Sequence, residues 1–348
     1  MAAPPAITII LPTYNRAAFL PQALASIRAQ QCGDWELVVV DDGSNDDSGA
    51  VLTRLTEPIS SRVRVVTQSN QGAYAARNTG LDHAAGRYIA FFDSDDEWLP
   101  HHLASCHAAL EQWADVHWVY GASRLVDHAS RETLTASSFY VDGRPRPFLG
   151  LRREQRDGLY VIDDPDVISR VLRGAGLFCG LQNSLIRREV FDRLRFEVGF
   201  RNESEDQAFV IRALARGFRF AYFDVVHHIY HVHRGNSSAS AIGLTTEQGV
   251  RVYGELIKGF QALPRQVNLT PAQRRALKDR LSREYFWHLG YSTLWRAGRH
   301  REALAAYRQG LRLFPWRASY WKTYGVSLIR SLPARLSGEF RAPRPSSD

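Results

Sequence analysis

The sequence has no long apolar run and few cysteines. No apolar stretch in its 348 residues approaches the length of roughly 18 residues that a membrane-spanning helix requires. The first ten residues, MAAPPAITII, lack a basic region, so we expect no secretory signal peptide. The three cysteines, Cys32, Cys106 and Cys179, are scattered and odd in number, which argues against a disulfide framework and fits a reducing compartment. We therefore expect a cytoplasmic protein.

The net charge of +8 is unevenly distributed. Residues 251–348 hold 19 basic and 6 acidic side chains, whereas residues 1–250 hold 25 basic and 30 acidic side chains. Such a basic region fits an anionic membrane surface, an acidic partner or nucleic acid, and equally a solvated helical surface rich in arginine. Because no nucleic-acid-binding motif accompanies it, we expect no nucleic-acid partner. Peripheral contact with an anionic membrane at the inner face stays open.

Apolar runs alternate with helical patterns over the first hundred residues. Continuous apolar, β-branched runs such as ITIIL are typical of strands buried on both faces. Strand alternating with helix predicts an α/β fold whose mostly parallel sheet is flanked by helices. We expect strands at 7–11, 36–40, 62–66 and 87–92, and helices near 19–27, 51–55 and 72–85.

The rest of the chain is less regular at first and then helical. Residues 121–180 show no motif, a helix is expected from Ser204, and residues 219–233 are typical of extended chain. Thr270-Pro271-Ala272-Gln273 has the form of a helix capping box. Residues 287–315 resemble one tetratricopeptide-type helical hairpin. The tail at 337–348 has the composition of a disordered segment.

Polar clusters follow three of the expected strands. PTYN, DDGS and DSDD each come directly after an apolar run. Ligands of open α/β sheets bind beyond the carboxyl ends of the strands, so these clusters should meet in one carboxylate-rich crevice.

The acids of DSDD have three interpretations: a site for a hard divalent cation, a glycosidase-like catalytic dyad, or a solvated turn that caps the next helix. Adjacency counts against a dyad. For Asp93 and Asp95 we favour Mn²⁺ or Mg²⁺ held together with a substrate phosphate. For Glu97 we favour the start of the next helix. A phosphate needs cationic partners, and Arg77 lies on the helix that follows the turn at Gly72.

Other residues admit two interpretations each. On a strand, His227, His231 and His233 share one face, which allows zinc binding, although one histidine serving the Mn²⁺ or Mg²⁺ site is favoured. Asp41 contacts a nucleotide or caps its turn. Trp98 stacks on a sugar or, as we favour, packs in the core. Cys179 is not expected to be a nucleophile, because no activating base is identifiable.

Taken in order, these motifs resemble glycosyltransferase family 2, whose nucleotide-sugar-binding fold is called GT-A. The resemblance is strong over residues 7–100 and moderate over 180–240. The segments that carry it are ITIILPTYNR, WELVVVDDGS, NQGAYAARNTGL, GRYIAFFDSDDEWLP, SEDQAFVIRALARG and YHVHRGNSS.

The resemblance implies a GT-A type, Rossmann-like, mostly parallel sheet flanked by helices, with a C-terminal helical extension. It implies a nucleotide-sugar-binding half at 1–120 and an acceptor-binding and catalytic half at 121–245. The extension with its hairpin then covers 246–336, before the tail at 337–348. The nucleotide-binding residues it implies are Pro12, Thr13, Tyr14, Asp42, Arg77 and Asp93, with Asp42 favouring uracil.

For chemistry, the resemblance implies Asp95 as the principal metal ligand, His233 as a contact to metal or diphosphate, and Asp206 as the catalytic base. The reaction would be a single displacement with inversion, from a nucleoside diphosphate sugar to a hydroxyl of a saccharide or lipid-linked saccharide. The cofactor would be Mn²⁺ or Mg²⁺. Alternatives are a transferase acting on a polyprenyl phosphate and a non-catalytic nucleotide-sugar-binding scaffold.

Overall fold

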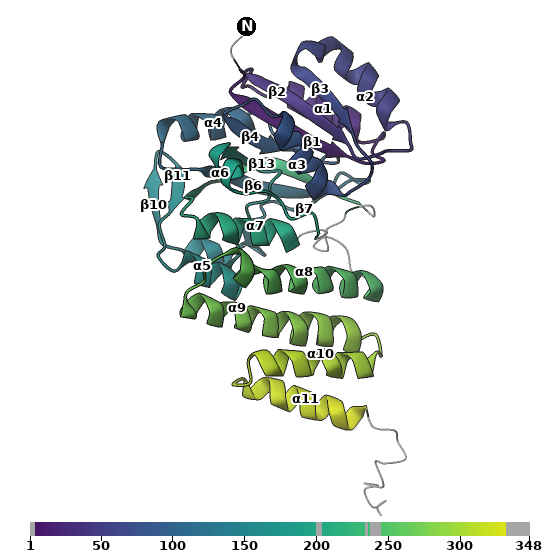
Figure 1. Ribbon diagram of the computed structural model, residues 1–348, viewed down its shortest axis with the longest axis vertical. Coiled ribbons are helices and arrows are strands. Elements are labelled where there is room, and N and C mark those ends of the chain that lie inside the picture. The colour runs from purple at the N-terminus through teal and green to yellow at the C-terminus, as the bar shows by residue number, and fades with distance from the viewer. Residues whose placement is uncertain (1–3, 200–203, 234–235, 237–244, 332–348) are drawn as a thin grey trace, which may run out of the picture.

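The computed structural model describes residues 4–199, 204–233, 236 and 245–331 (Figure 1). The predicted tail at 337–348 lies outside these residues. The strands are β1 (Ile7–Thr13), β2 (Trp35–Asp41), β3 (Val63–Thr67), β4 (Tyr88–Phe91), β5 (Glu97–Trp98), β6 (Trp118–Asp127), β7 (Thr133–Thr135), β8 (Tyr140–Val141), β9 (Arg144–Pro145), β10 (Arg153–Arg156), β11 (Leu159–Ile162), β12 (Ser184–Arg187) and β13 (Phe220–Val232).

The α-helices are α1 (Leu20–Arg28), α2 (Ser48–Thr56), α3 (Ala73–His83), α4 (His102–Gln112), α5 (Val167–Arg170), α6 (Glu189–Arg193), α7 (Ser204–Ala215), α8 (Thr246–Gln266), α9 (Pro271–Arg283), α10 (His300–Leu313) and α11 (Ala318–Arg330). Two 3₁₀ segments, η1 (Glu57–Arg62) and η2 (Pro147–Gly150), and two π-helical segments, η3 (Val171–Ala175) and η4 (Glu284–Trp295), complete the description.

One large mixed sheet forms the centre of the molecule. Its strand order is β10-β11-β13-β6-β12-β4-β1-β2-β3. Strands β3, β2, β1 and β4 pair in parallel, and β6 pairs in parallel with β13. Because β12 is antiparallel to both β4 and β6, those two strands point the same way. Six strands therefore share one direction, which confirms the predicted α/β fold.

The core lies on both faces of this sheet. Ile9 and Ile10 are neighbours on β1 and fully buried, yet they belong to the two different hydrophobic clusters. This is the period-two alternation of a strand that is covered on both sides. Helices α1 and α4 pack on one face through Leu24 and Leu110, and α3 and α7 pack on the other. The strands and helices predicted within residues 7–92 are confirmed to within a few residues at their ends.

The C-terminal helices stack beneath the sheet, as Figure 1 shows for α8 to α11. Helices α8 and α9 contribute Ile257, Phe260 and Leu277 to the same hydrophobic cluster as the sheet, whereas η4, α10 and α11 have a smaller cluster of their own. The Thr270 capping box is confirmed, with Thr270 accepting from the backbone N–H of Gln273. Segments η4 and α10 pack together within the stretch predicted as a helical hairpin, and its tetratricopeptide-like character stays a prediction. The domain boundaries at 120, 245 and 336 stay predictions.

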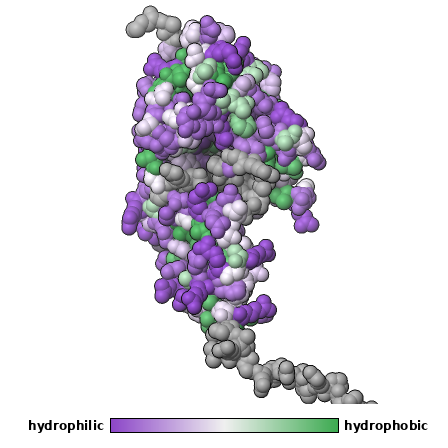
Figure 2. Space-filling model, turned by 90° about the vertical axis from the view of Figure 1, so that its right-hand side faces the viewer, coloured by the Kyte–Doolittle hydropathy of each residue, from purple (hydrophilic) through white to green (hydrophobic). Residues whose placement is uncertain are grey.

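No helix within the described parts of the chain is both long and apolar enough to cross a membrane. Figure 2 shows hydrophobic residues in separate patches among hydrophilic ones on the face that it presents.

The expected role of Glu97 is wrong. Glu97 and Trp98 form the short strand β5, which pairs with His228 and Ile229 of β13, and the next helix begins only at His102. Backbone pairing with a strand some 130 residues away was not readable from the local sequence, in which Trp98-Leu99-Pro100 is typical of a helix start. Trp98 itself packs in the core as predicted, and its indole N–H donates to the carbonyl of Gln182.

Candidate active site

The carboxyl ends of β1, β2, β4 and β13 lie at the same edge of the sheet, because these strands run in one direction. PTYN, DDGS and DSDD follow the first three of these strands, and His233 follows β13. The structure therefore gathers the predicted polar clusters at one edge.

Each acid of DSDDE has its own partner. Asp93 accepts a hydrogen bond from Arg77 at 2.8 Å, and Asp95 lies 3.2 Å from Arg16 and 3.1 Å from Nε2 of His233. Burial opposes ionisation of Asp95, but the hydrogen bond from His233 and the charge of Arg16 hold its pKa below the ordinary value. Asp95 is thus a carboxylate over the working pH range of most enzymes.

Asp95 and His233 are arranged as two ligands of one divalent cation would be. For metal–ligand distances of about 2.1 Å and octahedral angles, two neighbouring ligand atoms lie about 3.0 Å apart. The observed separation of 3.1 Å fits. The ring of His233 stacks on Phe19, with 4.7 Å between centroids, which fixes its orientation. Two protein ligands are what Mn²⁺ or Mg²⁺ needs when water and substrate phosphate supply the others.

The next two acids, Asp96 and Glu97, interact with histidines of β13. Asp96 is buried. Its carboxyl group lies 2.9 Å from Nε2 of His228 and accepts a hydrogen bond from the backbone N–H of His231 at 3.1 Å. Burial and the neighbouring acids raise the pKa of Asp96 well above its ordinary value, and burial lowers the pKa of His228 to about 4. Both groups are shifted toward their neutral forms. Glu97 pairs with His231 at 2.5 Å, and that hydrogen bond lowers the pKa of Glu97.

Asp42 anchors the loop that leads into α3. Its buried carboxylate accepts from the side chain of Gln68 at 2.8 Å and from the backbone N–H groups of Gln71 at 2.9 Å and Gly72 at 2.7 Å. Gly72 has a φ of +92°, so its conformation favours glycine, and α3 begins directly after it. Asp41 accepts from the backbone N–H of Ser44, which matches the turn-capping interpretation.

The end of β1 lies at the same edge of the sheet. Pro12 and Thr13 are the last residues of β1, and Thr13 is paired in register with Asp41 of β2. Tyr14 follows and is 44% exposed, which leaves its ring accessible to a ligand. The hydroxyl of Thr13 is buried and has no hydrogen-bond partner within the described residues. These positions agree with the nucleotide-pocket role that the resemblance implies, which stays a prediction.

Arg77 connects the strand end to α7. Its guanidinium is buried, pairs with Asp93 and lies over the ring of Tyr74 at 5.3 Å. Burial opposes its charge, but Asp93 and then Asp206 raise the pKa of Arg77 above the ordinary value. Burial, together with the charge of Asp206 and a hydrogen bond to it, raises the pKa of Tyr74 well above 10.0. Asp206 therefore lies beside both Tyr74 and Arg77.

Glu205 and Asp206 are neighbours with different environments. Glu205 is fully buried and accepts from Arg212 and from the backbone N–H of Glu197 at 2.8 Å. Burial raises the pKa of Glu205 to about 7, although Arg212 opposes this shift. Glu205 holds the first turn of α7 in place, whereas Asp206 is only partly buried and interacts with Tyr74 and Arg77.

Two site residues were not predicted from the sequence, namely Arg16 and Tyr74. Arg16 follows PTYN directly, and Tyr74 precedes Arg77 by three residues on the same helix, so both positions carried a readable signal. The zinc interpretation of His227, His231 and His233 is not supported, because His227 contacts α4 while His231 and His233 contact Glu97 and Asp95. Cys179 is buried, and burial raises the pKa of its thiol, which agrees with an unreactive cysteine.

The fold is of the GT-A type. The S. aureus protein TarS (residues 1–349), solved in complex with UDP-GlcNAc, superposes with a TM-score of 0.60 at 18% identity, over 88% of this chain and 81% of that one. The mannosyltransferase PcManGT from Pyrobaculum calidifontis, solved with GDP-Man and Mn²⁺, superposes with a TM-score of 0.55 at 21% identity. This superposition covers 96% of this chain and 83% of PcManGT. At these identities the superpositions show the fold alone.

Sequence comparison gives the family. The model of Glycosyl transferase family 2 matches residues 8–195, which is more than half of the chain. The protein belongs to glycosyltransferase family 2. Succinoglycan biosynthesis protein ExoW of Rhizobium meliloti is 29% identical over 209 residues, covering 58% of this chain and 61% of ExoW. The chain thus matches less than two thirds of the length of this relative.

Proposed function

We propose that the protein is a metal-dependent, inverting glycosyltransferase that moves a sugar from a nucleoside diphosphate sugar to a hydroxyl of a saccharide or lipid-linked saccharide. The observation that carries the proposal is the placement of Asp206, a carboxylate on α7, beside Arg77, which itself pairs with Asp93 at the end of β4. Asp206 and the proposed metal ligands, Asp95 and His233, thus lie at one edge of the sheet.

The two kinds of carboxylate have separate tasks. Asp206 accepts the proton of the acceptor hydroxyl as its oxygen attacks the anomeric carbon. Tyr74 and Arg77 hold Asp206 in place, and Arg77 adds positive charge on the donor side of the site. Asp95 and His233 hold Mn²⁺ or Mg²⁺, which when bound supplies positive charge for the leaving nucleoside diphosphate.

The donor is proposed to be a UDP-sugar. TarS was solved with UDP-GlcNAc, which supports UDP, whereas PcManGT was solved with GDP-Man, so the base is the first thing to test. The name of ExoW supports a role in the synthesis of a cell-surface polysaccharide. An imidazole ligand beside a carboxylate favours Mn²⁺ over Mg²⁺, because Mg²⁺ is the harder cation and is bound almost entirely by oxygen.

The test begins with thermal-shift screening of UDP- and GDP-sugars in the presence of Mn²⁺. With the donor so found, release of the nucleoside diphosphate is measured for wild type, Asp206→Asn and the control Asp192→Asn, an exposed acid on α6. Asp206→Asn should lose about 10²- to 10⁴-fold in turnover, the usual contribution of a general base, with donor affinity within about twofold. Unchanged turnover in Asp206→Asn would refute its role as base.

The metal assignment is tested separately by calorimetry. Mn²⁺ should strengthen binding of the nucleoside diphosphate to wild type, and both Asp95→Asn and His233→Ala should abolish that gain. Equal donor binding in the presence of a chelator would contradict metal dependence. Because binding and turnover are read independently, a failed metal assignment leaves the assignment of Asp206 testable.

Peripheral contact with an anionic membrane is proposed for α11. Trp321, Leu328 and Ile329 are exposed at spacings of seven and eight residues, which places them on one face of this helix. The same helix carries two exposed basic residues, Lys322 and Arg330. Flotation with anionic vesicles should recover wild type at low salt but not at high salt. The double substitution Trp321→Ala and Ile329→Ala should remove binding. Equal flotation with uncharged vesicles would contradict the electrostatic part.

A further inference from the structure

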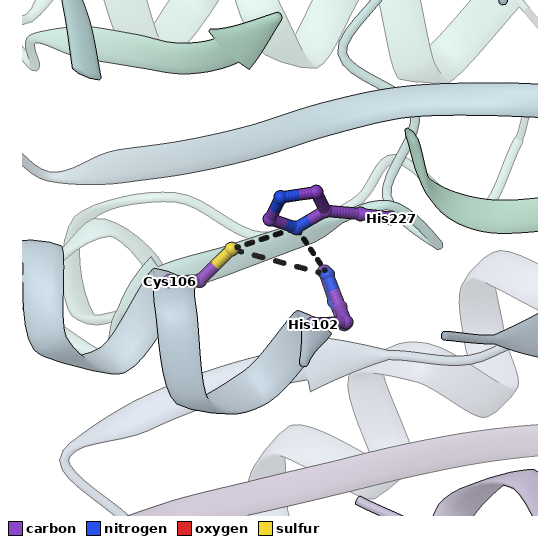
Figure 3. Close-up of side chains that lie close together, drawn as sticks. All are labelled: His102, Cys106 and His227. Atoms are coloured by element: carbon purple, nitrogen blue, oxygen red, sulfur yellow. Dashed lines mark hydrogen bonds between the residues drawn. The ribbon is translucent and has the colours of Figure 1, made fainter. Parts of the chain in front are cut away.

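A second group of metal-ligating side chains lies away from the site just described. His102 and Cys106 are one turn apart on α4, and His227 lies on β13. All three side chains are buried, and Figure 3 shows their nitrogen and sulfur atoms turned toward one another. Nδ1 of His102 lies 3.2 Å from Nδ1 of His227. Sγ of Cys106 lies 3.7 Å from Nδ1 of His227 and 3.9 Å from Nδ1 of His102.

These separations match the edges of a tetrahedral zinc site. With zinc–nitrogen distances of about 2.0–2.1 Å and a zinc–sulfur distance of about 2.3 Å, tetrahedral angles place two nitrogens about 3.3 Å apart and nitrogen and sulfur about 3.6 Å apart. The observed values deviate from these by only a few tenths of an ångström. One ion can therefore reach all three atoms without movement of the backbone.

The fold builds the niche for the ring of His227. A Cβ on Gly121 of β6 would clash with this ring, so only glycine leaves room for it there. Phe223 stacks on the other side, with centroids 5.4 Å apart and an angle of 15° between the planes. The carbonyl of His227 accepts from the backbone N–H of Leu99 at 2.9 Å. The three ligand atoms thus meet because α4 and β13 hold them, with room left by Gly121 of β6, and not through chance rotation of a surface side chain.

Two buried nitrogens next to the three ligand atoms, neither of them a ligand atom itself, are not satisfied by the described part of the protein. Nε2 of His102 and Nε2 of the adjacent His101 are buried without a hydrogen-bond partner among the residues that the structure describes. Unpaired buried polar atoms are costly and rare. The ring of His101 lies edge-on to that of His227, with centroids 4.7 Å apart.

We propose that His102, Cys106 and His227 bind one zinc ion that ties α4 to β13. A thiolate with two imidazoles is a ligand set for zinc rather than for Mn²⁺ or Mg²⁺, which prefer oxygen. On binding, the thiol of Cys106 releases its proton to solvent, and the sulfur electron pair goes to zinc. The site is structural, because its ligands are buried from substrate.

The protonation states of the three side chains before metal binding agree with such a site. Burial lowers the pKa of His227 to about 3 and that of His102 well below its usual range, so both imidazoles are neutral and have a lone pair available. Burial also raises the pKa of the Cys106 thiol, which without a metal stays protonated. Since the ligands are inaccessible in the folded protein, zinc is expected to enter during folding.

The first test is metal content. Untagged protein from zinc-supplemented cells is dialysed against a chelator and analysed by plasma mass spectrometry. About one zinc per chain is expected for wild type and for Cys179→Ser, a substitution at another buried cysteine, and almost none for Cys106→Ser. Asp95→Asn should keep its zinc, which separates this site from the strand-end site. Zinc retained in folded Cys106→Ser would refute the proposal.

The second test needs no variant. Wild type produced in cobalt-supplemented, zinc-depleted medium should show the visible bands of tetrahedral Co²⁺ and the near-ultraviolet charge-transfer band of a cobalt–thiolate bond. Folded wild type without zinc and without these bands would overturn the inference. The proposal concerns a site outside the transferase machinery, so it stands or fails independently of the proposed function.

Discussion

Replacement of Asp42 by asparagine tests how the nucleotide-binding edge is held together. The carboxylate accepts three hydrogen bonds, and the oxygen that faces Gly72 does so at 2.7 Å. In Asp42→Asn one oxygen can keep the bonds from Gln68 and Gln71, but an NH₂ group then faces the N–H of Gly72. One hydrogen bond to a charged acceptor is lost, worth about 1.5–3 kcal/mol, and an unpaired buried donor costs a further 1–3 kcal/mol or so.

The expected loss of stability is therefore about 3–5 kcal/mol. For a chain of 348 residues, an unfolding entropy near 2.1 cal/mol/K per residue converts this loss into a fall of about 4–7 °C in Tm. The measurement is differential scanning calorimetry, with Asp41→Asn as the control because Asp41 accepts from the neighbouring Ser44. An unchanged Tm together with weakened nucleotide binding would refute the anchoring role and assign Asp42 to direct contact with the base.

Two further predictions concern pH dependence and packing. Because the folded-state pKa of Glu205 is raised from 4.5 to about 7, its contribution to stability is fully present below pH 4.5 and is lost as the pH rises through about 7. Glu205→Gln should flatten this part of the stability profile in urea unfolding at several pH values, and an equal slope in both proteins would contradict it. A Cβ at Gly80 of α3 would clash with Ile10 of β1, so Gly80→Ala should destabilise by about 1–3 kcal/mol. Gly49→Ala in α2 meets nothing within 4 Å and should instead stabilise by about 0.5–1 kcal/mol, so equal effects of the two substitutions would show that packing is not the cause.

The first hundred residues were predictable because their structure is encoded locally. The apolar runs at 7–11 and 36–40 are long enough only for strands, and they are too apolar to have a solvent-exposed face. Because these strands pair in parallel, the polar clusters that follow them lie at the same edge of the sheet. The capping box at Thr270 is local in the same sense, since its two hydrogen bonds join residues three apart.

Long-range pairing was not readable. Nothing near Ser184 indicates that β12 inserts antiparallel between β4 and β6, and nothing near Glu97 indicates that it pairs with Ile229. Period-two alternation predicted that His227, His231 and His233 share one face of the strand. Register shifts between Phe223 and His228 interrupt this alternation, so the residues before and after the shifts do not keep to the predicted faces. His227 thus faces α4, and only the three-dimensional packing identifies its partners.

The hydrophobic cluster shared by the sheet and helices α8 and α9 has a practical consequence for shortening the protein. An expression product that stops before α8 would expose the apolar side chains of α7 and η3 that these helices cover, and the apolar surface left in water would favour aggregation. Helix α11 belongs instead to the smaller cluster of η4 and α10. Removal of α11 alone would expose Phe286, which stacks on Tyr320, and Tyr307, which lies edge-on to Tyr324. Point substitutions on the outer surface are therefore better probes of the extension than truncation.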